Sequence, residues 1–127
     1  MWEQYNPNPS RKSVGDCVIR ALTKVLDISW EQAFIELAIQ AFLMSDMPSS
    51  NSVWGALLKS KGFSKHVIPD SCPDCYTIKD FATDHSGIYV ACTGTHVVAV
   101  IDGVYFDSWD SGNEVPIFYW RKSHGRI

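Results

Sequence analysis

The 127-residue chain has no long apolar run, no excess of positive charge and no export signal. No uninterrupted apolar stretch approaches the roughly 20 residues that span a bilayer. Residues 1–10 are polar and contain proline, without a basic region followed by an apolar run. The formal net charge is −3 and no basic stripe is present, which excludes nucleic acid as a main partner. We therefore expect a cytoplasmic protein that binds neither membranes nor nucleic acid.

Cysteine and histidine are also few, with four residues of each. Without an export signal the thiols are expected to stay reduced. Cys72 and Cys75 have the spacing of half a zinc site, but no second such pair exists, and a full site would need His66, His85 and Cys92. We interpret the Cys72–Cys75 segment as a turn with two incidental thiols and Cys92 as a core residue, and expect no metal and no organic cofactor.

The chain does contain enough apolar material for a core, because 46% of its residues are hydrophobic and 13% are aromatic. That content is too high for a disordered chain. The length fits one compact domain, and no internal repeat or linker interrupts it. We predict a single domain over residues 1–127.

Helical patterns dominate the first half. Apolar residues recur at helical spacing after Asp16, the expected N-cap of a helix over 17–26, and again after the Ser29–Gln32 capping pattern. A third helix is expected over 53–61, ending at Gly62, and a short fourth helix is expected over 77–83.

Strand patterns dominate the second half, where β-branched and aromatic runs alternate with Gly, Asp and Asn. The expected strands are 88–92, 96–101, 104–109 and 115–120, with a further short strand over 63–68. The fold class is therefore α+β, with N-terminal helices packed on a C-terminal antiparallel sheet.

The pair Asp102-Gly103 predicts a two-residue type I′ turn between two of these strands. If Ile101 pairs with Val104, the register places Val98 opposite Asp107 and His96 opposite Trp109. Because side chains alternate faces along a strand, His96, Val98, Asp107 and Trp109 should project from the same face.

His96 and Asp107 are then diagonal neighbours, close enough for a hydrogen bond between imidazole and carboxylate. A carboxylate on one ring nitrogen fixes the tautomer of the histidine and stabilises its charged form, as nucleophile activation requires. Trp109 would shield that hydrogen bond from water. An ordinary polar pair on a sheet face would give the same pattern.

Cys17 is the candidate nucleophile because it falls in the first turn of the first helix. There the positive end of the helix dipole lowers the pKa of a thiol and stabilises its thiolate. A buried structural cysteine is the simpler interpretation of such a residue taken alone.

Together these residues resemble the papain-like cysteine peptidases. In that superfamily the nucleophilic cysteine heads a central helix, the histidine begins a strand, and an Asn or Asp follows on the next strand, as in Asp107-Ser108-Trp109 here. The segments Gly15-Asp-Cys-Val-Ile-Arg-Ala21 and His96-Val-Val-Ala-Val-Ile-Asp-Gly103 also resemble compact papain-like proteins encoded by phages and prophages.

The resemblance implies a compact papain-like fold and a cysteine hydrolase that cleaves a peptide, isopeptide or amide bond of a protein or peptide substrate. It assigns Cys17, His96, Asp107 and Trp109 as nucleophile, base, orienting group and shield. A papain-like enzyme usually carries a Gln about six residues before the cysteine as an oxyanion donor, but that position is Arg11. Asn8 is our candidate donor, and Asn6 and Gln4 are the alternatives.

Two further functions are compatible with the same residues. A deamidase or acyltransferase would keep the triad and change the acyl acceptor. A phage-encoded binding or inhibitor protein would keep the fold without turnover, which the absence of the upstream Gln favours and the intact Cys, His and Asp oppose.

Overall fold

The computed structural model describes residues 1–69 and 75–123 and contains four helices and a six-stranded mixed sheet in an α+β arrangement. The helices are α1 (Cys17–Leu26), α2 (Trp30–Met44), α3 (Asn51–Ser60) and α4 (Ile78–Asp84). The strands are β1 (Trp2–Gln4), β2 (Phe63–Val67), β3 (Ile88–Cys92), β4 (Val97–Ile101), β5 (Val104–Asp107) and β6 (Phe118–Lys122). Among these described residues no helix is long and apolar enough to cross a membrane.

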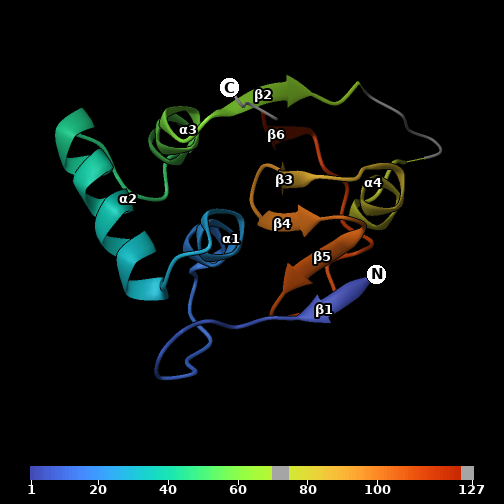
Figure 1. Cartoon of the computed structure of the whole chain (residues 1–127), viewed down its shortest axis with the longest axis horizontal. Coiled ribbons are helices and arrows are strands. Elements are labelled where there is room, and N and C mark those ends of the chain that lie inside the picture. Colours follow the sequence, from blue (N-terminus) through green and yellow to red (C-terminus); the bar gives the residue numbers. More distant parts are fainter. Residues whose placement is uncertain (70–74, 124–127) are drawn as a thin grey trace.

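The sheet has the strand order β1-β5-β4-β3-β6-β2 (Figure 1). The sequence-based prediction of a purely antiparallel, C-terminal sheet is wrong in one respect. The N-terminal strand β1 joins the sheet edge and runs parallel to β5, with Glu3 paired to Phe106. The other neighbouring strands are antiparallel.

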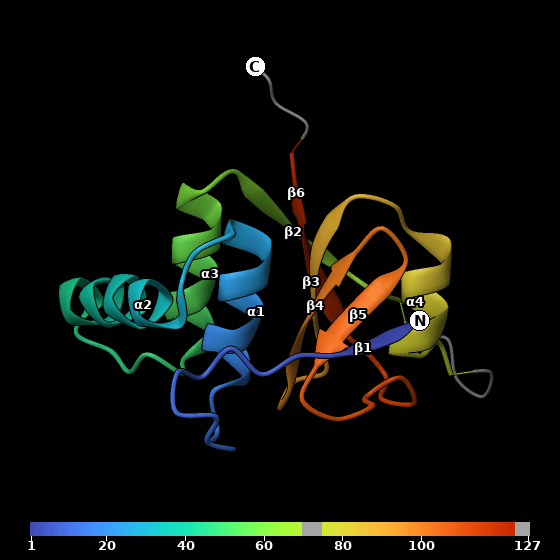
Figure 2. The same cartoon turned by 60° about the horizontal axis from the view of Figure 1, so that its bottom comes forward.

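The helices cover both faces of the sheet (Figure 2). One apolar cluster lies between α1, α2, α3 and the sheet, and its largest buried side chains include Leu22, Leu37 and Trp54. A second, smaller cluster packs Ile78 and Phe81 of α4 against the opposite face. Cys92 is 1% exposed within the first cluster, in agreement with its prediction as a core residue.

The turn at Asp102-Gly103 has the predicted form. Both residues have positive φ, 48° and 87°, as a type I′ turn requires. Ile101 pairs with Val104 and Ala99 with Phe106, so the predicted register is confirmed over these residues. This register brings the start of β4 close to the end of β5.

Several predicted boundaries shift, each for a local reason. Helix α3 begins at Asn51, two residues before the prediction, because the Ser50 carbonyl accepts the amides of Val53 and Trp54. Strand β5 ends at Asp107 and not at Trp109, because the Asp107 carboxylate accepts the Ser108 amide and turns the chain. Strand β6 begins at Phe118, after Pro116, which has no amide proton to donate.

Candidate active site

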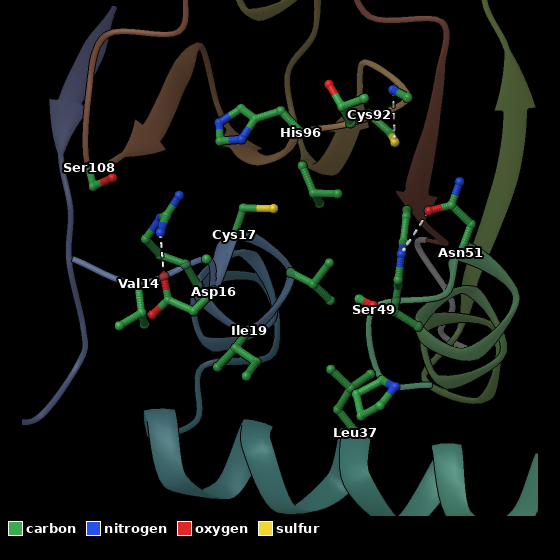
Figure 3. Close-up of a pocket in the computed structure, with 18 of the residues that line it drawn as sticks. Val14, Asp16, Cys17, Ile19, Leu37, Ser49, Asn51, Cys92, His96 and Ser108 are labelled. Carbon is green, nitrogen blue, oxygen red and sulfur yellow. Dashed lines mark hydrogen bonds and ion pairs between the residues drawn. The ribbon is translucent and has the colours of Figure 1, made fainter. Parts of the chain in front are cut away.

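A cleft of about 550 Å³ opens between the N-terminus of α1, the α2–α3 connection, the β3–β4 turn and the segment after β5. Cys17, His96 and Trp109 all line it. Figure 3 shows the side chains of Cys17 and His96 coming from opposite walls, the first from a helix and the second from the sheet. The predicted nucleophile and base are therefore brought together at one cleft.

Cys17 is the first residue of α1 and is partly exposed to the cleft. Asp16 occupies the N-cap position as predicted, but its side chain makes no capping hydrogen bond. The carboxylate instead accepts bonds from Arg20 at 2.6 Å and from the Trp30 indole at 2.9 Å. The Cys17 thiol thus sits at the positive end of a helix dipole, where negative charge is stabilised.

His96 lies immediately before β4, because this strand begins at Val97, one residue later than predicted. The turn with Thr93 fixes it: the His96 amide donates to the Thr93 hydroxyl at 3.1 Å, and the Thr93 amide donates to the His96 carbonyl at 2.9 Å. Its Nε2 lies 2.6 Å from Oδ2 of Asp107, which confirms the predicted pairing. Nδ1 is consequently the ring nitrogen left for Cys17.

The prediction of one shared face needs a correction at Val98. Val98 belongs to the cluster on the α4 side of the sheet, whereas His96 and Asp107 interact with residues of α1 on the other side. His96 precedes β4 and Asp107 is the last residue of β5, so strict strand alternation does not extend to these two residues. They meet at the end of the sheet.

Asp107 is fully buried and accepts four hydrogen bonds. Oδ1 accepts from Nη2 of Arg20 at 3.0 Å and from the amide of Ser108 at 2.8 Å. Oδ2 accepts from His96 and, at 2.6 Å, from the hydroxyl of Ser111. The carboxylate is therefore saturated with donors and held in one orientation.

Arg20 and Ser111 are functional candidates that the sequence did not assign. Arg20 is 6% exposed and links Asp16 to Asp107, so its guanidinium connects the start of α1 with the end of β5. Its spacing of four residues from Asp16 was a signal for the first of these ion pairs. No short-range pattern pointed to the second, which joins residues 87 positions apart.

Trp109 lies against the His96 ring, with ring centroids 5.0 Å apart and an interplanar angle of 37°. This contact agrees with its predicted place beside the histidine. Trp109 is itself 45% exposed, so it covers the ring from the solvent side of the cleft.

The protonation of the pair follows from these contacts. Burial alone would raise the pKa of Cys17, but hydrogen bonding with His96 and Val97 and the charges of His96 and Arg20 lower it below its ordinary value. Burial alone would lower the pKa of His96, but bonding with Asp107 and Cys17 raises it to about 9. These opposite shifts favour proton transfer from the thiol to the imidazole, which gives a thiolate–imidazolium pair.

Asp107 stays ionised beside this pair. Burial would raise the pKa of its carboxyl, but the hydrogen bonds from His96 and Ser111 and the charges of His96 and Arg20 hold that pKa below its usual value. The pKa of Cys92 is instead raised, chiefly by burial. Of the two free cysteines in the described part of the chain, only Cys17 has a pKa below its ordinary value.

The predicted oxyanion donor Asn8 lies elsewhere. Asn8 is buried in the loop before α1, where its side-chain oxygen accepts the amides of Ser10 at 2.9 Å and Lys12 at 3.3 Å. Neither Asn8 nor the alternatives Asn6 and Gln4 line the cleft. The structure therefore gives Asn8 a role in shaping this loop.

Over residues 1–69 and 75–123, no group of three His, Cys, Asp or Glu side chains could hold a metal ion. Cys75 is disulfide-bonded, so the prediction that its thiol stays reduced is wrong. Cys72, the other cysteine of the considered CxxC site, lies outside the described residues.

The site itself is the main guide to function. No protein-family model, no curated protein and no solved structure matches this chain.

Proposed function

We propose that this protein is a papain-like cysteine hydrolase in which Cys17 is the nucleophile, His96 the general base and acid, and Asp107 the orienting group. The observation that carries the proposal is the placement of His96 between the thiol of Cys17 and the buried carboxylate of Asp107. The opposite pKa shifts of Cys17 and His96 support it, because a thiolate is the reactive form of cysteine.

The order of these groups on the fold also supports a papain-like assignment. The candidate nucleophile begins a helix, the base precedes a strand and the orienting group ends the neighbouring strand. Trp109 covers the histidine two residues beyond the orienting group. This is the arrangement that the sequence resemblance implies.

The proposed reaction is acyl transfer through a thioester. The Cys17 thiolate adds to a peptide, isopeptide or amide carbonyl, and the resulting oxyanion is stabilised at the N-terminus of α1, where the Cys17 amide is a donor. The His96 imidazolium protonates the leaving nitrogen, so that the carbon–nitrogen bond breaks and an acyl-Cys17 thioester remains. Neutral His96 then removes a proton from water, which attacks the thioester and releases the acid and the thiolate.

A generic acyl donor tests the proposal without knowledge of the substrate. With p-nitrophenyl acetate we expect a burst of p-nitrophenolate, an acetyl group on Cys17 by mass spectrometry, and continued release beyond one equivalent per chain. Cys17→Ser should abolish the burst. Cys92→Ser is the matched control and should retain it, because Cys92 is buried and its pKa is raised.

The result also separates the competing functions. Burst without turnover in water, but turnover after an amine is added, would assign an acyltransferase. The absence of acetylated Cys17 in the folded wild-type protein would contradict the proposal and favour a binding protein of the same fold.

A further inference from the structure

Helix α2 carries apolar side chains on two sides. On one side Ala33, Leu37 and Ala41 are buried. On the other side five large apolar side chains are between 48% and 82% exposed, namely Phe34, Ile35, Ile39, Phe42 and Leu43. Figure 1 shows α2 as the outermost helix, on the far side of α1 and α3 from the sheet. We call these five residues the α2 stripe.

The α2 stripe is continuous. At about 100° per residue, its five members fall within roughly one half of the helix circumference and extend over about three turns. Glu36, the charged residue within the same span of sequence, lies off the stripe and pairs with Lys61 at 2.9 Å. No ionic group therefore interrupts the apolar surface between Phe34 and Leu43, and such surfaces on folded proteins are typical of binding sites.

Its area fits a protein interface of ordinary size. A large apolar side chain has roughly 150–200 Å² of surface, so five of them at these exposures present on the order of 500 Å². A standard interface buries about 800 Å² per partner, of which about 56–65% is non-polar. The α2 stripe alone supplies that apolar fraction, and the polar residues beside it supply the rim.

We propose that the α2 stripe is the interface of a homodimer, in which the α2 helices of two copies pack antiparallel about a two-fold axis. The sequence of the stripe is self-complementary about a point between Ala38 and Ile39. An antiparallel pairing places Phe34 at the level of Leu43 of the second copy and Ile35 at the level of Phe42 of the second copy. At the axis the large Ile39 meets the small Ala38, as a symmetric interface requires.

A lipid surface fits the α2 stripe less well. Helices that lie on membranes carry Lys and Arg beside their apolar face, which attract anionic headgroups. The charged residues nearest the ends of the stripe are Glu31 and Asp46, both acidic. Antiparallel packing of two copies needs no such cations, and it opposes the two helix dipoles favourably.

The dimer would leave the cleft open. Leu37 lies on the buried side of α2 and lines the cleft, whereas the α2 stripe faces away from it. The proposal is therefore independent of the proposed hydrolase activity, and each can fail alone.

Light scattering after size-exclusion chromatography tests the interface. We expect the wild-type protein to have twice the 14.3 kDa mass of the chain and to dissociate on dilution. Ile39→Glu and Phe42→Glu should each weaken the dimer at least tenfold, because each buries a charge at the interface. Val67→Glu is the matched control, since Val67 is 76% exposed on β2, and it should leave the dimer unchanged.

Thiol cross-linking tests the packing itself. In a Cys17→Ser background, Ile39→Cys should be cross-linked between chains by a short bismaleimide, because it lies beside the axis, and Val67→Cys should not. A wild-type protein that stays monomeric up to about 100 µM, well above the Kd expected of a standard interface, would overturn the proposal. A dimer that survives both glutamate substitutions and is not cross-linked at position 39 would overturn it equally.

Discussion

Asp107→Asn tests whether the site needs a carboxylate beside His96 or whether a neutral amide can replace it. The carboxylate accepts four hydrogen bonds, two on each oxygen. An asparagine side chain keeps one oxygen and replaces the other by an NH₂ group, which cannot accept. If the oxygen stays with His96 and Ser111, the NH₂ group faces the donors of Arg20 and Ser108.

The expected cost follows from those two donors. A buried donor without an acceptor costs about 1–3 kcal/mol, and more when it is charged. Arg20 keeps its bond of 2.6 Å to Asp16, which limits the loss on that side. We therefore expect Asp107→Asn to lower the free energy of unfolding by about 2–4 kcal/mol, and to reduce the fraction of Cys17 that is thiolate.

The loss should depend on pH. The pKa of His96 is about 6.5 in the unfolded chain and is raised to about 9 in the folded protein. This shift stabilises the folded protein fully below about pH 6.5, and the stabilisation is lost as pH rises through about 9. The pKa of Asp107 is lowered from about 3.9 in the unfolded chain. This shift stabilises the folded protein above about pH 3.9, and the stabilisation is lost as pH falls through the pKa of the folded state. The difference between wild type and Asp107→Asn should be largest between about pH 4 and 6.5 and smaller above pH 9.

Urea unfolding at pH 5.5 and pH 9.5 measures both quantities, with iodoacetamide labelling of Cys17 as the readout of the site. Asp27→Asn is the matched control. Asp27 is exposed, with a φ of 55° that asparagine adopts readily, and its substitution should change stability little. Equal stability of Asp107→Asn and wild type at pH 5.5 would refute the argument that the negative charge is required here.

The remaining predictions concern neighbouring positions. His96→Ala should move the pH profile of Cys17 alkylation close to that of a free thiol, since the helix dipole alone is worth about 0.3–1 kcal/mol; an unchanged profile by mass spectrometry would contradict the ion pair. Arg20→Met leaves two buried carboxylates without their cation and should cost about 3–5 kcal/mol in urea unfolding at pH 7, whereas a loss below about 1 kcal/mol would contradict this role. Gly112→Ala places a methyl group against the hydroxyl of the buried Tyr105 and should cost about 1–3 kcal/mol by the same measurement, and unchanged stability would contradict this close contact.

The parts of the site that sequence predicted are those set by short-range rules. The Asp102-Gly103 turn fixes its own register, and that register brings the ends of two adjacent strands together. The pairing of His96 with Asp107 follows from residues only eleven positions apart. The start of α1 at Cys17 follows from helical periodicity, and its observed bounds match the prediction.

The parts that sequence did not predict depend on long-range contacts. Strand β1 has only three residues, and its partner β5 lies about a hundred residues further along the chain. The direction of the Arg20 side chain depends on Asp107, which only the tertiary fold brings near. The prediction of Asn8 as the oxyanion donor was wrong for a related reason. Its side chain accepts hydrogen bonds from two amides of its own loop, and sequence periodicity does not predict such loop contacts.

The geometry of α1 ties the candidate chemistry to the integrity of the fold. Cys17 and Arg20 are three residues apart, so they lie on the same face of this helix. Cys17 carries the thiol that contacts His96, and Arg20 forms an ion pair with Asp107, the carboxylate bound to His96. Any shift of α1 relative to the sheet would therefore separate the thiol from the imidazole and the guanidinium from Asp107 at the same time. Because Leu22 and Val25 on this helix are buried in the main apolar cluster, the packing of the core and the alignment of the site depend on the same contacts.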